Sequence, residues 1–588
     1  MNFLRKFSKP ITQHPVFLTW MFMLLGFHLL QELHGEVALG EFKYLRRTLG
    51  SIAFCLFESW MLTWLVALCK RKWAKIAIYV FALSISIIYL FLKFNFGTSF
   101  SPQIMILVAE TNGNESAEFL RTFLPQTGTL KSVALIAAFA IAIILTERAN
   151  TKISNILQKH RFGTVIVVLF GAVILYGAIF GAYAYFRMFS AKNVNELESL
   201  TLAVRPTDHI TEIIYSTLCP LRSGDETKSV EKFTIAASKE SATCSAADAN
   251  DSLAVVMVIG ESYIRSHAQI YGYNLPTTPN MTAEMQSGRL YKFDDVVAPY
   301  NTTSVSLKNA LSCNSIADGE HWYERPLFPS IIKAAGFSVW FWDAQWNCGK
   351  GESVFDFSLN SAIHGKNIAP YCYNHVNDTT PQYDLQLIED FSAHHKPQNL
   401  EFVIFHLMGQ HYYARARYPK QIAENWFHAS DISRSESWVT DSKRQDIAEY
   451  DNATRYNDLV LKSIFDLYAD RNAVVVYFAD HGEEVYDIRD FRGRDHNMTK
   501  SKAVLEYQNG IPFIIWCSDK YIATHPEQVD AIKQAQRKPF MIDNVCQIIF
   551  YLAHVQTRHY QSERNPLSSD YKSSHRIVNG NADYDAIK

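Results

Sequence analysis

The chain has no marked excess of charge of either sign and few cysteines. Its 588 residues include 56 Lys and Arg against 58 Asp and Glu, a formal net charge of −2. It therefore lacks the basic surplus expected of a nucleic-acid-binding protein. It also shows no internal repeat, which argues against a solenoid or propeller. Of its nine cysteines, Cys55 and Cys69 lie in apolar stretches.

The other cysteines are odd in number, so at least one thiol stays unpaired even in an oxidising compartment. They are Cys219, Cys244, Cys313, Cys348, Cys372, Cys517 and Cys546. Several pairings are compatible with this set. A pair between Cys348 and Cys372 is favoured, because these two residues flank one loop-like segment.

Charged residues are scarce within five apolar stretches of the first third of the chain. The stretches cover residues 15–33, 51–69, 74–92, 131–145 and 163–186. Most of them approach the roughly 20 residues that a helix needs to cross a bilayer. The first lacks an obvious small-residue cleavage site and four more follow it, so a signal peptide alone does not explain it. We therefore predict an N-terminal five-helix transmembrane bundle over residues 1–186.

Basic residues predict the orientation of this bundle. They precede the first stretch and fill the loops after the second and the fourth: Arg5, Lys6, Lys9, Lys70, Arg71, Lys72, Lys75, Arg148, Lys152, Lys159 and Arg161. The positive-inside rule makes that side cytoplasmic. Everything after Phe186 then lies outside, and so does the loop 95–129. That loop is long enough for one or two helices on the outer membrane surface.

The outer part of the chain alternates strand-like runs with helical patterns. Residues 187–250 have no sustained apolar period and predict a linker with one short helix near the membrane. Strand-like runs follow at 253–259, 337–342, 402–406, 473–478 and 511–516. This alternation predicts an α/β domain over residues 251–557, with a mostly parallel sheet covered by helices on both faces. The polar tail 558–588 is expected to be poorly ordered.

Two of these runs end in residue types that bind metals. LAVVMVI is followed by Gly260 and Glu261, and AVVVYFA is followed by Asp480 and His481. Solvated acidic caps would explain one such strand end, but two of them favour a shared site at the carboxyl edge of the sheet. Two carboxylates and an imidazole suit catalytic zinc. Manganese and magnesium remain compatible with the ligand types.

A hydroxyl-rich segment and three basic groups suggest phosphate chemistry beside that metal. Residues 301–306 read NTTSVS and lead into a helical pattern. Taken alone, this segment is better explained by an ordinary N-cap, but a helix N-terminus also favours a phosphate. His411, His496 and Lys350 follow strands or lie in a Gly-containing loop. Groups of this kind offset charge in a phosphoryl-transfer transition state.

The motifs GES, NTTSVS, HLMGQH and FADHGEE occur in the order seen in the alkaline phosphatase/sulfatase superfamily. With five predicted spans before them, the chain more closely resembles the membrane-bound phosphoethanolamine transferases. That family includes enzymes that decorate lipid A and confer polymyxin resistance. The resemblance covers about residues 10–556. It implies a multi-pass protein of the bacterial inner membrane with its catalytic domain in the periplasm, expected to act as a monomer.

The resemblance also implies roles for individual residues. Glu261, Thr303, Asp480 and His481 look like the ligands of one tight Zn²⁺ site. Thr303 is also the expected nucleophile, with Thr302 as the alternative register. His411 and His496 look like the two histidines that bind the phosphoryl group or a second zinc, and Glu483 matches an acidic residue there. The other substrate-binding positions are Lys350, which resembles the lysine that helps hold the phosphoethanolamine headgroup, Thr111 and Glu115. The last two match a T-x-x-x-E pair thought to contact the lipid substrate, although their spacing alone indicates only a solvated helix face.

Departures from the family pattern leave the acceptor open. The lipid A enzymes flank the nucleophile with a cysteine pair and a proline, whereas Pro299, Lys308 and Asn309 stand here. An asparagine expected one turn before Thr111 is Leu107. The acceptor is therefore lipid A, lipopolysaccharide core sugar, or another envelope glycan or protein.

The resemblance implies a reaction in two steps. Thr303 attacks phosphatidylethanolamine, and the phosphoethanolamine group then passes from threonine to the acceptor. A glycerophosphate transferase of the lipoteichoic acid synthase type shares this layout and would use phosphatidylglycerol. A phosphodiester hydrolase is a further alternative. A sulfatase needs a C/S-x-P-x-R pattern that is missing after Asp295, and a non-catalytic scaffold would not need the intact metal and nucleophile residues.

Overall fold

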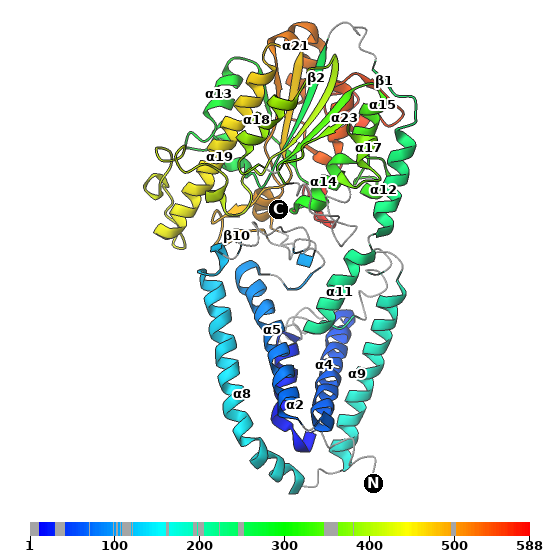
Figure 1. Cartoon of the computed structure of the whole chain (residues 1–588), viewed down its shortest axis with the longest axis vertical. Helices are drawn as coiled ribbons and strands as arrows, with labels where there is room; N and C mark the ends of the chain where they lie inside the picture. The colour runs from blue at the N-terminus through cyan, green and yellow to red at the C-terminus, as the bar shows by residue number, and fades with distance from the viewer. Residues whose placement is uncertain are drawn as a thin grey trace. The chain divides into compact units, whose positions relative to one another are not determined.

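The computed structural model divides the chain into two compact units (Figure 1). One comprises Met1–Thr111 with Leu120–Asp225, and the other Asn112–Phe119 with Glu226–Lys588. The structure describes residues 11–29, 42–69, 71–97, 99–101, 104–105, 108, 119, 121–159, 164–191, 197, 205–222, 224–244, 252–345, 363–379, 381–494 and 501–587. The segment predicted as a linker contributes to both units.

The first unit is helical. Its helices are α2 (Pro15–Gly26), α4 (Phe42–Cys69), α5 (Lys72–Phe96), α8 (Thr127–Lys159), α9 (Thr164–Ser190) and α11 (His209–Arg222). Four of them, α4, α5, α8 and α9, are long and apolar enough to cross a membrane. Many of their large apolar side chains are exposed, as expected where lipid replaces water. The described part of α2 has 12 residues, so four of the five predicted spans are supported and the count of five is not confirmed.

Small residues let two of these helices approach closely. A Cβ on Gly177 of α9 would lie 2.1 Å from the carbonyl oxygen of Ala53 in α4, and one on Gly181 would lie 1.9 Å from the Phe54 ring. Membrane helices commonly pack through small residues in this way, because van der Waals contact replaces the hydrophobic effect as the driving force.

The second unit contains a seven-stranded sheet in the order β3-β11-β8-β2-β7-β5-β6. The strands are β2 (Leu253–Gly260), β3 (Leu290–Phe293), β5 (Ser338–Asp343), β6 (His375–Val376), β7 (Leu400–His406), β8 (Ala473–Ala479) and β11 (Phe513–Cys517). In this sheet β11 is antiparallel to both of its neighbours, β3 and β8, and the other neighbouring pairs are parallel. The sheet is therefore mixed but mostly parallel. Its central strands, β2 and β8, are buried along their whole length, as their continuous apolar runs predict.

Helices cover both faces of this sheet (Figure 1). On one side lie α13 (Pro279–Gln286), α18 (Asp384–His394) and α19 (Asp441–Tyr468), and on the other α14 (Thr303–Leu311), α15 (Pro329–Ala334) and α23 (Val545–Leu552). The unit also contains α12 (Gly224–Ala237), α17 (Ala369–Cys372), α20 (Lys502–Gln508), α21 (Asp519–Thr524) and α22 (Pro526–Ala535).

Short strand pairs complete the second unit. They are β1 (Thr243–Cys244) with β13 (Val555–Gln556), β4 (Val296–Val297) with β12 (Phe540–Met541), and β9 (Glu484–Val485) with β10 (Arg492–Gly493).

The prediction of a poorly ordered tail is wrong. Strands β14 (Ile577–Val578) and β15 (Ala582–Asp583) form a hairpin near the end of the chain. Val578 and Tyr584 are buried in a small apolar cluster with residues of the domain. Arg576 forms ion pairs with Asp295 and Asp585. A few spaced apolar residues and one buried cation thus order a segment whose average composition is polar.

The favoured disulfide is not formed. Cys372 is a free, buried thiol at the end of α17, and it lies beside the backbone of Ser330. Cys348 lies outside the described residues. The thiol of Cys372 therefore belongs to the core rather than to a loop.

Candidate active site

The site lies where two neighbouring parallel strands end. β2 and β8 pair in register up to Gly260 and Ala479, so the residues that follow them stand side by side. One oxygen or nitrogen atom from each of Glu261, Asp480 and His481 lies within 4.8 Å of the others. All three side chains are fully buried. The convergence predicted from the two strand ends is thus present in the structure.

The carboxylates of this cluster are arranged to hold a cation. Oδ1 of Asp480 accepts hydrogen bonds from the backbone N–H groups of Ser262 and His481, at 3.0 and 2.8 Å. Oδ2 is buried and accepts no hydrogen bond from any described residue. Burial and the facing Glu261 carboxylate raise the pKa of Asp480. A cation between the two carboxylates would relieve this repulsion.

The imidazole of His481 is prepared as a ligand. Its Nδ1 lies 2.8 Å from the Gly482 carbonyl oxygen, so Nδ1 carries the proton and donates to that oxygen. Nε2 therefore keeps its lone pair on the side of the two carboxylates. Burial and the nearby Arg494 lower the pKa of His481 to about 3, which keeps the ring neutral. The three residues thus fit a zinc ion in donor type and protonation.

Thr303 brings a hydroxyl group to the same cluster. It is the first residue of α14, directly after the N-cap Thr302. Its Oγ lies 3.1 Å from Oε2 of Glu261 and 3.1 Å from Nε2 of His481. Ser306, one turn later, donates its hydroxyl to the Asp480 backbone oxygen at 2.6 Å. This bond fixes the start of α14 against the end of β8.

Two of the predicted phosphate-binding residues are also near this cluster. His411 acts electrostatically on Glu261, and burial lowers its own pKa to about 4. Its Nδ1 is buried and has no hydrogen-bond partner among the described residues. Glu483 is buried, and burial raises its pKa to about 7 against the opposing effect of Arg494 and Arg492.

The HLMGQH segment closely contacts Glu261. The backbone N–H of Gln410 donates to the Glu261 carbonyl oxygen at 3.0 Å. Gly409 has φ +49°, and a Cβ there would lie 2.8 Å from the Glu261 nitrogen. Asp384 holds this loop by accepting the N–H groups of Met408 and Gly409. A glycine is therefore required for the loop to lie this close to the turn that carries Glu261.

The other predicted site residues lie outside the described residues, so their positions stay predictions. They are Lys350, His496, Thr111 and Glu115.

Three residues of the site were missed in the sequence. The Ser262 hydroxyl donates to Oε1 of Glu261 at 2.6 Å, and the Gln345 side chain donates to Oε2 at 3.1 Å. Arg494 donates to Nε2 of His481 at 2.6 Å. Each follows a strand end or a motif residue, and this position in the sequence was the one indication that it could belong to the site. Their side-chain types are common, and only the folded chain brings them to the cluster.

A family model for sulfatases matches residues 254–539. This part of the chain therefore resembles the sulfatases in sequence. Curated relatives extend the similarity beyond it. Phosphoethanolamine transferase EptC of Escherichia coli O18:K1:H7 is 26% identical over 513 residues, covering 84% of this chain and 83% of the relative. Phosphoethanolamine transferase CptA of Salmonella typhimurium is 25% identical over 437 residues, covering 73% and 72%.

Solved structures share the fold. The C-terminal periplasmic domain of EptC from Escherichia coli matches this chain with a TM-score of 0.51 and 25% identity, covering 59% of this chain and 96% of that one. The integral membrane protein EptA from Neisseria meningitidis matches 94% of this chain and 98% of its own, with a TM-score of 0.59 and 16% identity. The resemblance predicted from the motifs is confirmed by these relatives.

Proposed function

We propose that the protein transfers phosphoethanolamine from phosphatidylethanolamine to an acceptor of the cell envelope, with lipid A or lipopolysaccharide core as the expected acceptor. One observation carries this proposal. The Thr303 hydroxyl lies 3.1 Å from both a carboxylate and an imidazole of the buried ligand cluster. A threonine in this position has what a nucleophile needs: a neighbouring cation site and an acceptor for its proton. The similarity to relatives named phosphoethanolamine transferases supports phosphoethanolamine as the transferred group.

The ligand cluster would hold zinc through Glu261, Asp480 and His481. Bound zinc would lower the pKa of a hydroxyl group and offset negative charge on the phosphoryl oxygens. Oδ2 of Asp480 has no hydrogen-bond partner among the described residues. Nε2 of the neutral His481 would exchange its contact with Arg494 for the ion. A second zinc, if present, would take His411 as one of its ligands.

The first half-reaction forms a covalent intermediate on Thr303. Its oxygen attacks the phosphorus, the bond to the diacylglycerol oxygen breaks, and the threonine proton ends on diacylglycerol. An oxygen of the acceptor then attacks the same phosphorus, and Thr303 recovers its proton from that acceptor. The phosphoryl group attacked by Thr303 would lie near the N-terminus of α14, which would favour its negative charge. His411 and Glu483 would contact the transferred group.

The apolar helices support a membrane location for this chemistry. We infer that the protein is a monomer of the bacterial inner membrane with the sulfatase-like domain in the periplasm. Both the donor and the expected acceptors are lipids or lipid-linked, so membrane anchoring keeps enzyme and substrates in the same layer. The loop with Thr111 and Glu115 is proposed to contact the lipid donor.

Mass spectrometry of the envelope tests this function. Lipid A, core oligosaccharide and other glycans are isolated from cells with and without the protein. We expect one fraction to gain the phosphoethanolamine mass increment only when the protein is present. A glycerophosphate increment would instead indicate phosphatidylglycerol as the donor. No increment in any fraction would contradict the assignment.

A further inference from the structure

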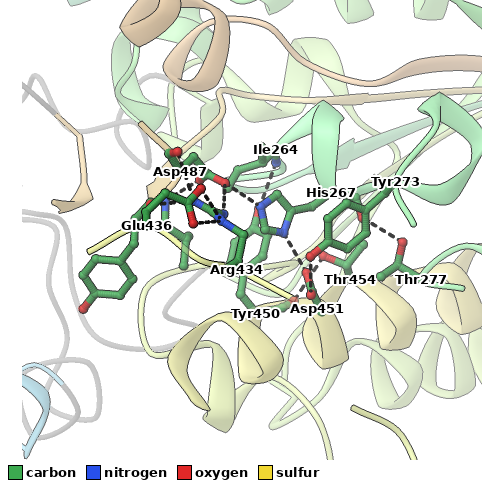
Figure 2. Close-up of polar contacts among 12 residues, drawn as sticks. Ile264, His267, Tyr273, Thr277, Arg434, Glu436, Tyr450, Asp451, Thr454 and Asp487 are labelled. Atoms are coloured by element: carbon green, nitrogen blue, oxygen red, sulfur yellow. Dashed lines mark hydrogen bonds and ion pairs between the residues drawn. The ribbon is translucent and has the colours of Figure 1, made fainter. Parts of the chain in front are cut away.

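A buried histidine next to the active site lies between two carboxylates (Figure 2). His267, in a short helical turn six residues after Glu261, has its Nδ1 2.7 Å from Oδ1 of Asp451 and its Nε2 3.0 Å from Oδ1 of Asp487. The side chains of these residues are exposed by only 2%, 0% and 4%. Carboxylate oxygens are acceptors, so both ring nitrogens must donate. The ring is therefore a buried imidazolium.

This cation joins three segments of the chain. His267 belongs to the segment that begins with Glu261, Asp451 lies on α19, and Asp487 belongs to the segment that begins with Asp480 and His481. Oδ2 of Asp487 accepts the backbone N–H of Val485 at 2.9 Å. Both segments that carry metal ligands are thus linked to one charged ring.

Further contacts hold the two carboxylates in place. Oδ2 of Asp451 accepts the Tyr273 hydroxyl at 2.8 Å. Arg434 donates to Oδ1 of Asp487 at 3.2 Å and to the carbonyl oxygen of Tyr486 at 2.8 Å. Two cations, His267 and Arg434, therefore face the two buried anions, and Arg434 also pairs with Glu436. Loss of the imidazolium would leave one buried carboxylate without its counter-charge.

The same turn of α19 also holds the peptide next to Glu261. The Tyr450 hydroxyl, adjacent to Asp451 in the chain, donates to the Ser262 carbonyl oxygen at 2.6 Å and accepts the Ile264 N–H at 2.8 Å. Ser262 has φ +53°, a conformation that an L-residue keeps only when its surroundings impose it. Ser262 in turn contacts both Glu261 and Asp480.

We propose that His267 is a positioning residue whose buried imidazolium, together with Tyr450, sets the separation between Glu261 and the Asp480–His481 pair. This inference rests on the proposed function, because it assigns the ring to the geometry of the proposed zinc site. The path runs from His267 to Asp451 and Tyr450, from Tyr450 to Ser262, and from Ser262 to both carboxylates. His267 itself does not touch the substrate.

The charge on His267 gives the proposal a pH signature. Burial acts to lower the pKa of His267, but Asp487 and Asp451 outweigh burial and raise it to about 10. The unfolded chain has a histidine pKa of about 6.5. The stabilisation is therefore complete below about pH 6.5 and is lost as the pH rises towards 10. The charged and titratable groups facing this ring are Asp451, Asp487, Arg434, Tyr273 and Tyr450.

The test compares the wild type with His267→Gln and Tyr450→Phe in the full-length purified protein. His321→Gln, at an exposed histidine, is the matched control. Cobalt(II) titration of the metal-free protein reports affinity, and the visible d–d bands report the geometry of the bound ion. We expect both test variants to bind cobalt about tenfold more weakly or worse, with altered bands, and to lose kcat rather than raise KM. The control should match the wild type.

A second measurement tests the charge. The thermal midpoint of the wild type is compared with that of His267→Gln at several values between pH 6.5 and pH 9.5. We expect the wild-type advantage to shrink as the pH rises, whereas a neutral packing role would keep it constant. If His267→Gln does not fold, the cobalt titration of Tyr450→Phe tests the proposal instead, because this substitution removes only one oxygen atom and should leave the fold intact.

Wild-type cobalt affinity and spectrum in Tyr450→Phe would overturn the proposal. Weakened cobalt binding in a chain whose wild type transfers no phosphoethanolamine would support the positioning role and reject the proposed function. If the wild type transfers phosphoethanolamine and folded His267→Gln has an unchanged kcat, the proposed function is supported and the positioning role of His267 is rejected.

Discussion

Replacement of Thr303 by alanine is expected to lower the rate of phosphoethanolamine transfer by roughly 10⁴-fold or more, because it removes the attacking oxygen. The fold should remain, since the hydroxyl contacts Glu261 and His481 of the cluster and α14 is anchored separately through Ser306. Metal binding should persist through the two carboxylates and the imidazole. The measurement is transfer from a fluorescent phosphatidylethanolamine by the purified protein in lipid nanodiscs.

Thr302→Ala is the matched control for this change. Thr302 is the N-cap residue of α14, but its side chain makes no capping hydrogen bond. We expect transfer by this variant to stay within about threefold of the wild type, because little helix stabilisation is lost. If Thr302→Ala abolishes transfer while Thr303→Ala retains it, the nucleophile is one residue earlier than proposed.

Glu261→Gln is expected to remove both tight metal binding and transfer. The substitution keeps the size of the side chain but replaces a carboxylate oxygen that faces Asp480 and His481 with a weak ligand. We expect a decrease in transfer of roughly 10³-fold, since the ion would supply both nucleophile activation and charge stabilisation. Removal of the metal from the wild type with a chelator should lower transfer as much as the Glu261→Gln substitution does, and added zinc should restore it.

A control variant and a metal analysis accompany the Glu261→Gln experiment. Glu424→Gln, at an exposed glutamate of the second unit, should leave metal content and transfer unchanged. Metal content is measured by elemental analysis of the purified proteins. Full transfer by a Glu261→Gln protein that retains no zinc, or by thoroughly chelated wild type, would reject the metal-dependent mechanism.

The strands that carry the site could be predicted because their sequence signal is strong. Continuous β-branched runs are typical of strands buried on both faces, and β2 and β8 match the predicted runs almost residue for residue. The direction of β11 could not be predicted, because an apolar run carries no information on strand polarity. The described part of α2 is likewise shorter than the apolar stretch that predicted it.

The ordered tail shows the limit of composition. The polar average of residues 558–588 hides Val578 and Tyr584, which are buried in an apolar cluster, and Arg576, which is paired with two aspartates. Order here depends on contacts with residues far away in the chain. A local reading of polarity cannot include those contacts.

The convergence of Glu261, Asp480 and His481 was predictable for a geometric reason. Carboxyl ends of adjacent parallel strands meet at one edge of a sheet, so ligands directly after two such strands converge. No comparable rule predicts the residues that contact and position this cluster. His267 and Gln345 are ordinary residue types in sequence, and their contacts with Asp451 and Glu261 arise only from tertiary packing.

Tandem mass spectrometry of the protein itself tests the central claim most directly. The purified protein is incubated with phosphatidylethanolamine in the absence of an acceptor, quenched and digested. We predict that the peptide containing Thr303 gains a phosphoethanolamine group on that residue, and that Thr303→Ala gains none. A modified residue elsewhere, or an unmodified wild-type protein that still releases diacylglycerol, would contradict the account.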